Sequence, residues 1–186
     1  MESQINTLTR LVEELLDVSK IQAGRLDYLQ ETVDLDALLR ESIDTMQQTC
    51  PDHTFVVHSA AQTCLIGDRD RLGQAFTNLL TNAIKYSPGA GTIEIDLCSA
   101  PDRVTIQVRD HGIGIPREQC DKIFERFYRA SGSTQRAIPG LGMGLYIVAE
   151  IIKRHEGTIS VDSTIGSGST FTITLPLRGR PEQEDQ

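Results

Sequence analysis

Hydrophobic residues recur at three- and four-residue steps through the first part of the chain. Polar side chains separate them between residues 3 and 24, and this spacing predicts one strongly amphipathic helix. Ser3 is a candidate N-cap, and Gly24 tolerates the left-handed turn that often follows a helix end. The apolar stripe must pack on the rest of the chain, on a second copy or on a further segment. It consists of Ile5, Leu8, Leu11, Val12, Leu15, Leu16, Val18 and Ile21.

In the rest of the chain, segments with a helical pattern are interspersed with segments with an extended pattern. The extended segments are rich in β-branched residues, and the last two segments form a hairpin-like pair around a glycine-bearing loop. Helices and mainly antiparallel strands in this order predict an α+β sandwich, with helices on one face of a sheet. The helices are expected over residues 35–48, after the cap Asp34, and over residues 70–86 and 145–155. The strands are expected to begin at Thr54, Thr92, Val104, Thr158 and Ser169.

Composition and charge favour a soluble globular protein with an aliphatic core. Aromatic residues make up 5% of the 186 residues, and the net charge of −8 argues against electrostatic binding of nucleic acid or an anionic membrane. No apolar run approaches the about 18 residues that span a bilayer, and no signal peptide is visible, so we expect a cytoplasmic chain. The cysteines form no CxxC pair and are expected to be reduced and mostly buried. They are Cys50, Cys64, Cys98 and Cys120.

The segment DHGIGIP, residues 110–116, follows a predicted strand that ends at Asp110. Gly112 and Gly114 let the backbone take positive φ or approach a flat ligand closely. A carboxylate buried at a strand end can accept a hydrogen bond from an amino group. Taken alone, the simpler interpretation of this segment is a tight turn after a strand.

The segment PGLGMGL places Gly140, Gly142 and Gly144 immediately before a predicted helix. Such a loop can direct free N–H groups and the positive end of the helix dipole at phosphate oxygens. The glycine spacing is GxGxG and no strand precedes it, whereas the dinucleotide fingerprint has GxGxxG after a strand. A Rossmann-type site is therefore excluded.

The helical segment NLLTNAIKYS carries Asn78 and Asn82 one turn apart and Lys85 three residues later. This spacing places two amide carbonyls and one ammonium group on one helix face. Amide oxygens suit a Mg²⁺ ion that retains several waters, and lysine offers a positive charge to phosphate. A solvated polar face is the commoner outcome for a single helix. Here, however, all three segments favour one ligand, which combines a purine amino group, a metal ion and phosphates.

Together with FERFYR at residues 124–129, these segments resemble the N-box, first glycine box, F-box and second glycine box of sensor histidine kinases of two-component systems. The resemblance is to the catalytic and ATP-binding domain, a member of the Bergerat-fold ATPase superfamily, and it implies that fold over residues 25–177. Residues 155–177 resemble the closing strands, with Glu156 where glycine is common. Residues 1–24 resemble the second helix of the dimerisation and histidine-phosphotransfer domain. Residues 178–186 are polar and are expected to be disordered.

The resemblance also implies residue roles in an ATP site. Asp110 would receive the adenine amino group, and Tyr86 would lie beside adenine or ribose. Asn78 and Asn82 would hold Mg²⁺, and the expected catalytic residues are Asn78, Lys85 and Arg129. Residues 130–139 match a mobile ATP lid, anchored by Phe124 and Phe127 as core residues. The expected nucleotide contacts are Asn78, Asn82, Lys85, Tyr86, Asp110, Gly112, Gly114, Ile115, Arg129, Gly140, Leu141, Gly142, Met143, Gly144 and Leu145.

The implied activity is transfer of the ATP γ-phosphoryl group to a histidine, for onward transfer to a response-regulator aspartate, in a homodimeric parent protein. Such an acceptor histidine is followed by an acidic residue and an Arg-Thr-Pro-like stretch. No histidine of this chain has that context, so the acceptor helix is expected before residue 1, and this chain alone is not expected to autophosphorylate. The four histidines are His53, His58, His111 and His155.

Three functions other than that of a histidine kinase are compatible with parts of this motif pattern. Hydrolytic relatives such as type II topoisomerases use a glutamate one turn before the metal-binding asparagine to activate water, and Asn78 occupies that position here. Efficient ATP hydrolysis is therefore disfavoured. A serine kinase of the anti-sigma type fits the leading helix and FERFYR poorly. A non-catalytic nucleotide-binding module is the alternative from another class. The residues that argue against it are the intact Asp110, Asn78, Asn82 and Lys85.

Overall fold

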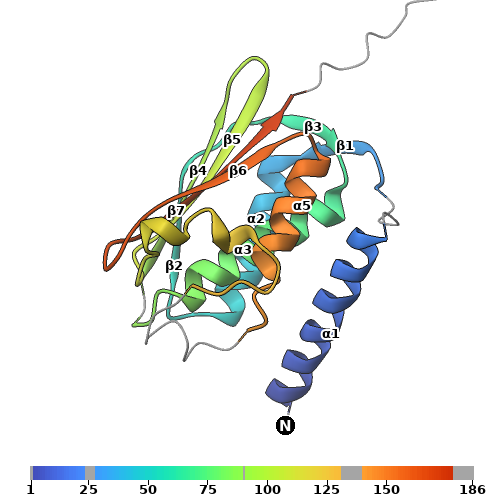
Figure 1. Ribbon diagram of the computed structural model, residues 1–186. Coiled ribbons are helices and arrows are strands. Elements are labelled where there is room, and N and C mark those ends of the chain that lie inside the picture. The colour runs from blue at the N-terminus through green and yellow to red at the C-terminus, as the bar shows by residue number, and fades with distance from the viewer. Residues whose placement is uncertain (1, 24–27, 90, 131–139, 178–186) are drawn as a thin grey trace, which may run out of the picture.

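A computed structural model describes residues 2–23, 28–89, 91–130 and 140–177 (Figure 1). The expected lid over residues 130–139, apart from Ala130, and the expected tail over residues 178–186 lie outside these ranges. The helices are α1 (Glu2–Gln22), α2 (Leu35–Thr49), α3 (Arg69–Lys85) and α5 (Gly144–Arg154), with the 3-10 turns η1 (Arg117–Gln119) and η2 (Lys122–Phe124). The strands are β1 (Glu31–Asp34), β2 (Thr54–Ser59), β3 (Cys64–Gly67), β4 (Thr92–Ser99), β5 (Arg103–Asp110), β6 (Thr158–Thr164) and β7 (Gly168–Pro176).

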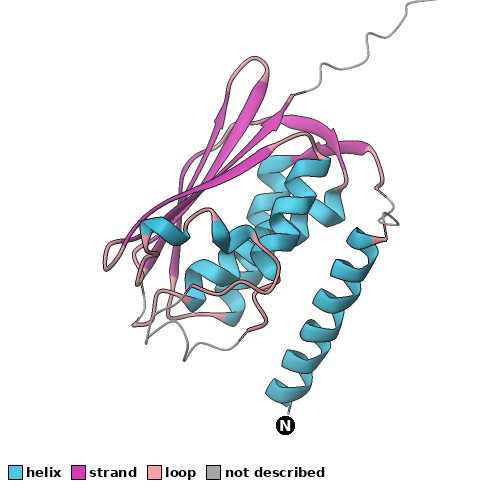
Figure 2. Cartoon of the chain, in the orientation of Figure 1, coloured by secondary structure: helices cyan, strands magenta, loops and turns pink. Residues whose placement is uncertain are grey.

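The main sheet has five strands in the order β2-β4-β5-β7-β6. Strand β2 pairs with β4 in parallel, and all the other neighbours are antiparallel. The helices α2, α3 and α5 lie together on one side of this sheet (Figure 2). The predicted α+β sandwich, with a mixed and mainly antiparallel sheet, is therefore confirmed. A separate two-stranded ribbon of β1 and β3 was not predicted.

The core lies between the sheet and the helical layer. Alternate residues of β4 point into it, and Ile93, Ile95 and Leu97 are almost fully buried. Helix α3 contributes the buried stripe that includes Phe76 and Leu80, and it packs against α5. Within the described ranges, no helix has the length and apolar character needed to cross a bilayer.

Aspartate side chains set the starts of α2 and α3. Asp34 accepts a hydrogen bond from Ala37 N at 3.0 Å, which confirms the predicted cap. Asp68 caps α3 by accepting from Arg71 N at 3.0 Å, so this helix begins slightly before its predicted start. The other oxygen of Asp68 accepts from Leu29 N at 3.0 Å. The segment that follows α1 is thereby attached to the start of α3.

Two expectations about individual side chains are wrong. The four cysteines are free, as expected, but Cys64 and Cys98 are exposed because they lie near strand ends rather than in the core. Phe124 packs against the core, edge-on to Phe171, whereas Phe127 is 53% exposed. The backbone of Phe127 has φ +61°, and its ring lies under the Arg126 guanidinium instead of in the core.

Helix α1 packs on the helical layer through its C-terminal half. Val18 is buried, and Asp17 Oδ1 accepts from Arg71 Nη1 at 3.0 Å. Arg71 Nη1 also donates to Gln74 Oε1, and Gln74 Nε2 donates back to Asp17 Oδ2. This closed set of hydrogen bonds joins α1 to α3. Part of the apolar stripe remains exposed, namely Leu8, Val12, Leu15 and Leu16.

We expect Asp17→Ala to loosen α1 from the rest of the protein. The Asp17 and Arg71 side chains are only 13% and 23% exposed. Loss of this hydrogen-bonded pair should lower the free energy of α1 opening by about 1–2 kcal/mol. Hydrogen exchange of the α1 amides measures that change. Glu13→Ala is the matched control, because Glu13 is an exposed carboxylate on the same helix. Equal α1 protection in both variants would contradict the assigned role of Asp17.

Candidate functional site

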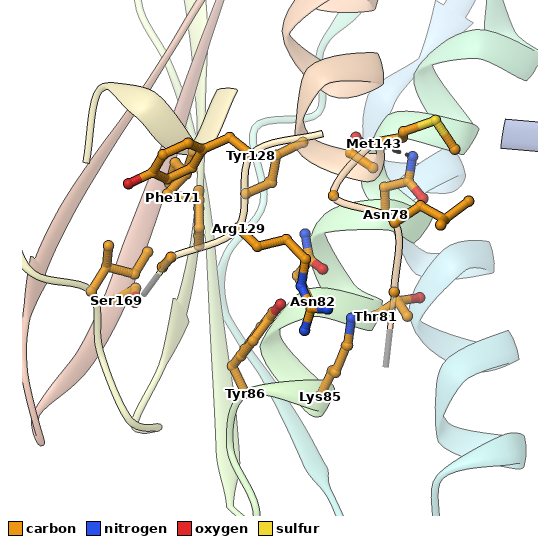
Figure 3. Close-up of a pocket in the computed structure, with 18 of the residues that line it drawn as sticks. Asn78, Thr81, Asn82, Lys85, Tyr86, Tyr128, Arg129, Met143, Ser169 and Phe171 are labelled. Atoms are coloured by element: carbon orange, nitrogen blue, oxygen red, sulfur yellow. Dashed lines mark hydrogen bonds between the residues drawn. The ribbon is translucent and has the colours of Figure 1, made fainter. Parts of the chain in front are cut away.

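One pocket, of about 950 Å³ and partly open to solvent, gathers nearly all of the predicted site residues. It lies between α3, the end of β5, the segment after η2 and the loop before α5. Figure 3 shows the side chains of Lys85 and Arg129 directed into it from α3 and from the segment after η2. Of the predicted contacts, only Gly112 is absent from the lining. The lining includes Asn78, Asn82, Lys85, Tyr86, Asp110, Gly114, Ile115, Arg129, Gly140, Leu141, Gly142, Met143, Gly144 and Leu145.

Asp110 provides a buried carboxylate at one end of the pocket. It ends β5 and is 3% exposed. Burial raises the pKa of the Asp110 carboxyl, and hydrogen bonds from the backbone N–H groups of Gly112 and Ser169 partly oppose that rise. The Gly112 N–H donates to Asp110 Oδ1 at 2.9 Å. Gly112 therefore does not line the pocket, but its hydrogen bond helps to hold the Asp110 carboxylate in place.

The loop after β5 requires glycine because the neighbouring backbone comes very close. A Cβ on Gly112 would lie 2.0 Å from the carbonyl oxygen of Tyr86. Gly114 has φ +68°, and a Cβ there would lie 2.1 Å from the carbonyl oxygen of Thr164. The simpler interpretation of DHGIGIP as only a tight turn is therefore insufficient, since the loop closes one wall of the pocket.

Positive side chains and amides occupy another part of the pocket. Lys85 Nζ lies 5.1 Å from the Tyr86 ring centroid, and a Cβ on Gly140 would lie 2.6 Å from the same Nζ. Burial raises the pKa of the Tyr86 phenol, and the positive charge of Arg129 partly opposes it. Asn78 Nδ2 donates to Gly144 O over a long 3.5 Å. This arrangement suits an anion such as a phosphate chain.

Comparison with known proteins identifies the family. Residues 67–179 match the family described as histidine kinase-, DNA gyrase B- and HSP90-like ATPases. The chain belongs to this ATPase family. It is 34% identical to the sensor histidine kinase WalK of Bacillus subtilis, over 99% of this chain and 30% of WalK. This histidine kinase ATP-binding domain thus spans about 30% of the length of that relative.

Solved histidine kinases share the fold of this ATP-binding domain. A mycobacterial sensor histidine kinase, MprB, aligns with a TM-score of 0.72 and 32% identity, over 81% of this chain and 99% of that one. Full-length ShkA in complex with AMPPNP aligns with a TM-score of 0.76 and 25% identity, over 91% of this chain and 36% of that one. These matches confirm the resemblance and the Bergerat-type fold inferred from the four boxes.

Several lining residues of the ATP-binding domain were not predicted from its sequence. Ser169 and Phe171 reach the pocket because β7 pairs with β5, which sets Ser169 opposite Asp110. Glu14 reaches it because α1 packs on the helical layer, and Thr81 lies between the two asparagines on α3. The remaining unpredicted residues are Ile123, Tyr128 and Ala130. Three of the unpredicted residues had a visible signal: Thr81 lies within NLLTNAIKYS, Tyr128 within FERFYR and Ala130 at the start of the expected lid.

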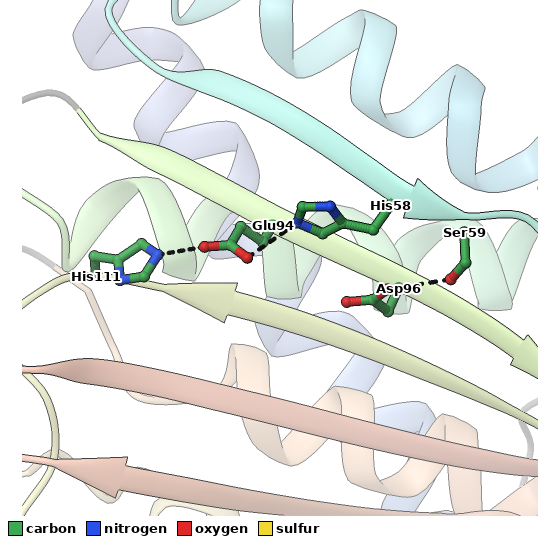
Figure 4. Close-up of polar contacts among 5 residues, drawn as sticks. All are labelled: His58, Ser59, Glu94, Asp96 and His111. Carbon is green, nitrogen blue, oxygen red and sulfur yellow. Dashed lines mark hydrogen bonds and ion pairs between the residues drawn. The ribbon is translucent and has the colours of Figure 1, made fainter.

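The four histidines of this domain all lie in described segments, and none lines the pocket. His58 and His111 flank the Glu94 carboxylate, with Nε2 to oxygen distances of 3.0 and 2.7 Å (Figure 4). Hydrogen bonds from His111 and His58 hold the pKa of Glu94 below its usual range. His53 is buried, with Nε2 at 3.2 Å from Ser87 O. Both ring nitrogens of His155 are engaged, one with Ile151 O and one with the Asp68 N–H.

Proposed function

We propose that this domain binds ATP with Mg²⁺ and, in a longer histidine kinase, presents the γ-phosphoryl group to a histidine on a separate helix. The phosphoryl group would then pass to an aspartate of a response regulator. The observation that carries the proposal is a single pocket that joins a buried carboxylate, Asp110, to the cationic side chains Lys85 and Arg129. This combination matches the polarity of a nucleotide, whose base offers an amino group and whose phosphates are anionic.

Each end of the pocket has its own role in this proposal. Asp110 accepts a hydrogen bond from the adenine amino group, and Tyr86 lies beside adenine or ribose. Lys85 and Arg129 neutralise charge on the phosphates as the phosphoryl group leaves. The glycines of the loop before α5, Gly140, Gly142 and Gly144, let backbone N–H groups approach the phosphates. Because Asn78 carries an amide, it offers no general base for water, and hydrolysis should be slow.

The residues present fit a magnesium ion held between protein and nucleotide. Asn78 and Asn82 stand one turn apart on α3 and both line the pocket, so their amide oxygens can serve as hard ligands. When bound, the ion offsets negative charge on the phosphates. A site with two amide ligands relies on the phosphates for further ligands, so metal and ATP should bind cooperatively.

The domain boundaries and partners belong to the same proposal. Residues 1–24 form part of a dimerisation and phosphotransfer domain, residues 25–177 form the catalytic domain, and the parent protein is a homodimer. The exposed apolar side chains of α1, including Leu8 and Leu15, support a bundle partner for that helix. We place the domain in the cytoplasm, where ATP and response regulators are found.

We expect Mg²⁺ to strengthen binding of ATP but not of adenosine. Asn78 and Asn82 would hold the ion, which would offset charge on the phosphates, and adenosine has no phosphate for it to act on. Calorimetry with and without Mg²⁺ should show at least about tenfold tighter ATP binding with the metal, which corresponds to ~1.4 kcal/mol. Asn82→Ala should remove most of this difference. A metal effect of equal size on ATP and adenosine would argue against the proposed site.

A further inference from the structure

Ser87 joins α3 to the loop that follows Asp110. Its backbone N–H donates to Ile84 O at 3.2 Å, and its carbonyl oxygen lies 3.2 Å from His53 Nε2. Its side chain is buried, with the residue only 6% exposed. These contacts fix the backbone, so the hydroxyl can change its direction only by side-chain rotation, about χ1 or about the Cβ–Oγ bond.

The Ser87 hydroxyl lies against the backbone of Gly112, next to the Asp110 carboxylate. A Cβ on Gly112 would lie 2.8 Å from Ser87 Oγ, and the Gly112 N–H itself donates to Asp110. The hydroxyl is close enough to help lower the pKa of Asp110. Nevertheless, Ser87 Oγ makes no hydrogen bond of normal geometry with the described part of the chain. The contact of this hydroxyl with Asp110 is therefore weak or poorly aligned here. Because buried hydroxyls normally make a full hydrogen bond, we expect the contact to tighten in another state.

Asp110 is the nearby charged acceptor with capacity for another hydrogen bond. The Tyr86 carbonyl oxygen accepts from Ile113 N at 3.0 Å and keeps one further lone pair, but it is neutral, whereas a carboxylate is the stronger acceptor. A carboxylate has about four acceptor sites. The N–H groups of Gly112 and Ser169 use two of those on Asp110, and an adenine amino group would use a third. One acceptor site on Asp110 therefore remains for a donor inside the protein.

We propose that Ser87 is a positioning residue for adenine recognition, whose hydroxyl donates to the Asp110 carboxylate when nucleotide is bound. This role rests on the proposed function, because it requires that Asp110 receives the adenine amino group. The hydroxyl would hold the carboxylate in one orientation and keep it ionised. Asn78 and Lys85 lie on α3, and Ser87 comes just after the C-cap of that helix. A hydrogen bond from Ser87 to Asp110 would therefore connect the adenine end of the pocket to the phosphate end.

The test is Ser87→Ala, studied by calorimetry and by NMR titration of the Asp110 carboxyl carbon. ATP and adenosine should both bind about tenfold more weakly, as expected for loss of one hydrogen bond to a charged group. The two ligands should lose the same factor, because Ser87 acts at the adenine end. The pKa of Asp110 should rise, a change that a purely structural defect would not produce. His111 also acts on Asp110, so the titration is repeated with His111→Gln present in both proteins.

Two further variants keep the test decisive. Ser87→Cys retains the volume with a poor donor, so it should show the same losses even if the alanine variant folds badly. Ser42→Ala is the matched control, because Ser42 is also buried, but it lies on α2 and donates within that helix, to Leu38 O at 3.0 Å. It should leave both nucleotide affinity and the Asp110 titration unchanged.

The outcomes separate this inference from the proposed function. If Asp110→Asn weakens ATP binding while both Ser87 variants bind like the unmodified protein, the role of Ser87 is overturned and the adenine site stands. If the Asp110→Asn variant binds ATP as tightly as the unmodified protein, the adenine assignment itself is overturned. Losses of similar size in Ser42→Ala, or an unchanged Asp110 pKa in both Ser87 variants, would also overturn the positioning role.

Discussion

Asp110→Asn is expected to weaken ATP binding by about 10- to 100-fold, the range for loss of a hydrogen bond to a buried charged group. The asparagine amide can present its NH₂ group to adenine, so a donor would face the donor on the base. GTP carries a carbonyl at the equivalent position of its purine, and the amide can donate to it. Preference for ATP over GTP should therefore fall together with ATP affinity. Calorimetry with both nucleotides measures the two effects.

The pKa of Asp110 adds a pH dependence with a defined sign. Burial raises this pKa in the folded protein, so the associated contribution to fold stability is present below the unfolded pKa and is lost as pH rises through the folded pKa. Nucleotide binding should show the opposite trend, because the ionised carboxylate is the better acceptor. ATP affinity of the unmodified protein should fall as pH drops through the Asp110 pKa, and that step should vanish in Asp110→Asn.

Asp162→Asn provides the control for this experiment. Asp162 is an exposed carboxylate on β6, two strands from Asp110, and it does not line the pocket. The variant should bind both nucleotides like the unmodified protein. Thermal unfolding of both variants checks that the fold is retained. An Asp110→Asn protein with unchanged ATP affinity and unchanged discrimination against GTP would refute the adenine assignment.

The long helices and the glycine loops could be predicted because their signals are local. Each of α2, α3 and α5 has an apolar stripe at helical spacing, and Asp34 has the side chain that a helix N-terminus needs. The glycine positions follow from close backbone contacts, such as that of Gly112 with the Tyr86 carbonyl. The helix stripes and the glycine motifs can be recognised from a few consecutive residues, whereas the contact that explains Gly112 is visible only in the tertiary structure.

Features that depend on distant pairing were not predicted. Strands β1 and β3 are four residues each, too short for an alternating pattern, and they form only because Val33 and Leu65 pair across the chain. Ser169 joins the site through the pairing of β5 with β7, and Glu14 joins through the packing of α1. Phe127 was placed in the core because its aromatic ring favours burial, yet its left-handed backbone turns the ring outward.

With labelled ATP and Mg²⁺, this chain is expected to become phosphorylated at least about 100-fold more slowly than a phosphotransfer domain that presents its acceptor histidine in line. Phosphoryl transfer depends mainly on in-line positioning of the acceptor, and small misplacements already lower rates by about that factor. His53 is buried beside the Ser87 carbonyl, and His155 uses both ring nitrogens inside the fold. Neither imidazole can approach a phosphate in the pocket.

His58 and His111 face away from the helical layer. Glu94, which both contact, alternates along β4 with Ile93 and Ile95, whose side chains enter the core on the opposite face. A γ-phosphate near Lys85 and Arg129 would lie on the helical side of the sheet. The sheet therefore separates these two imidazoles from the phosphate end of the pocket.

The expected result needs a positive control, since an inactive preparation would also remain unlabelled. An added phosphotransfer domain with an acceptor histidine should become labelled by this chain, and Asn82→Ala or Asp110→Asn should prevent that labelling. Acid-labile, base-stable label on the chain itself would contradict the prediction. Loss of such label in one of the variants His53→Gln, His58→Gln, His111→Gln or His155→Gln would identify the acceptor. Because the fold holds each imidazole away from the pocket of its own chain, that result would require either opening of the sheet or the α3–α5 layer, or transfer from a second copy to an exposed imidazole such as His58 or His111.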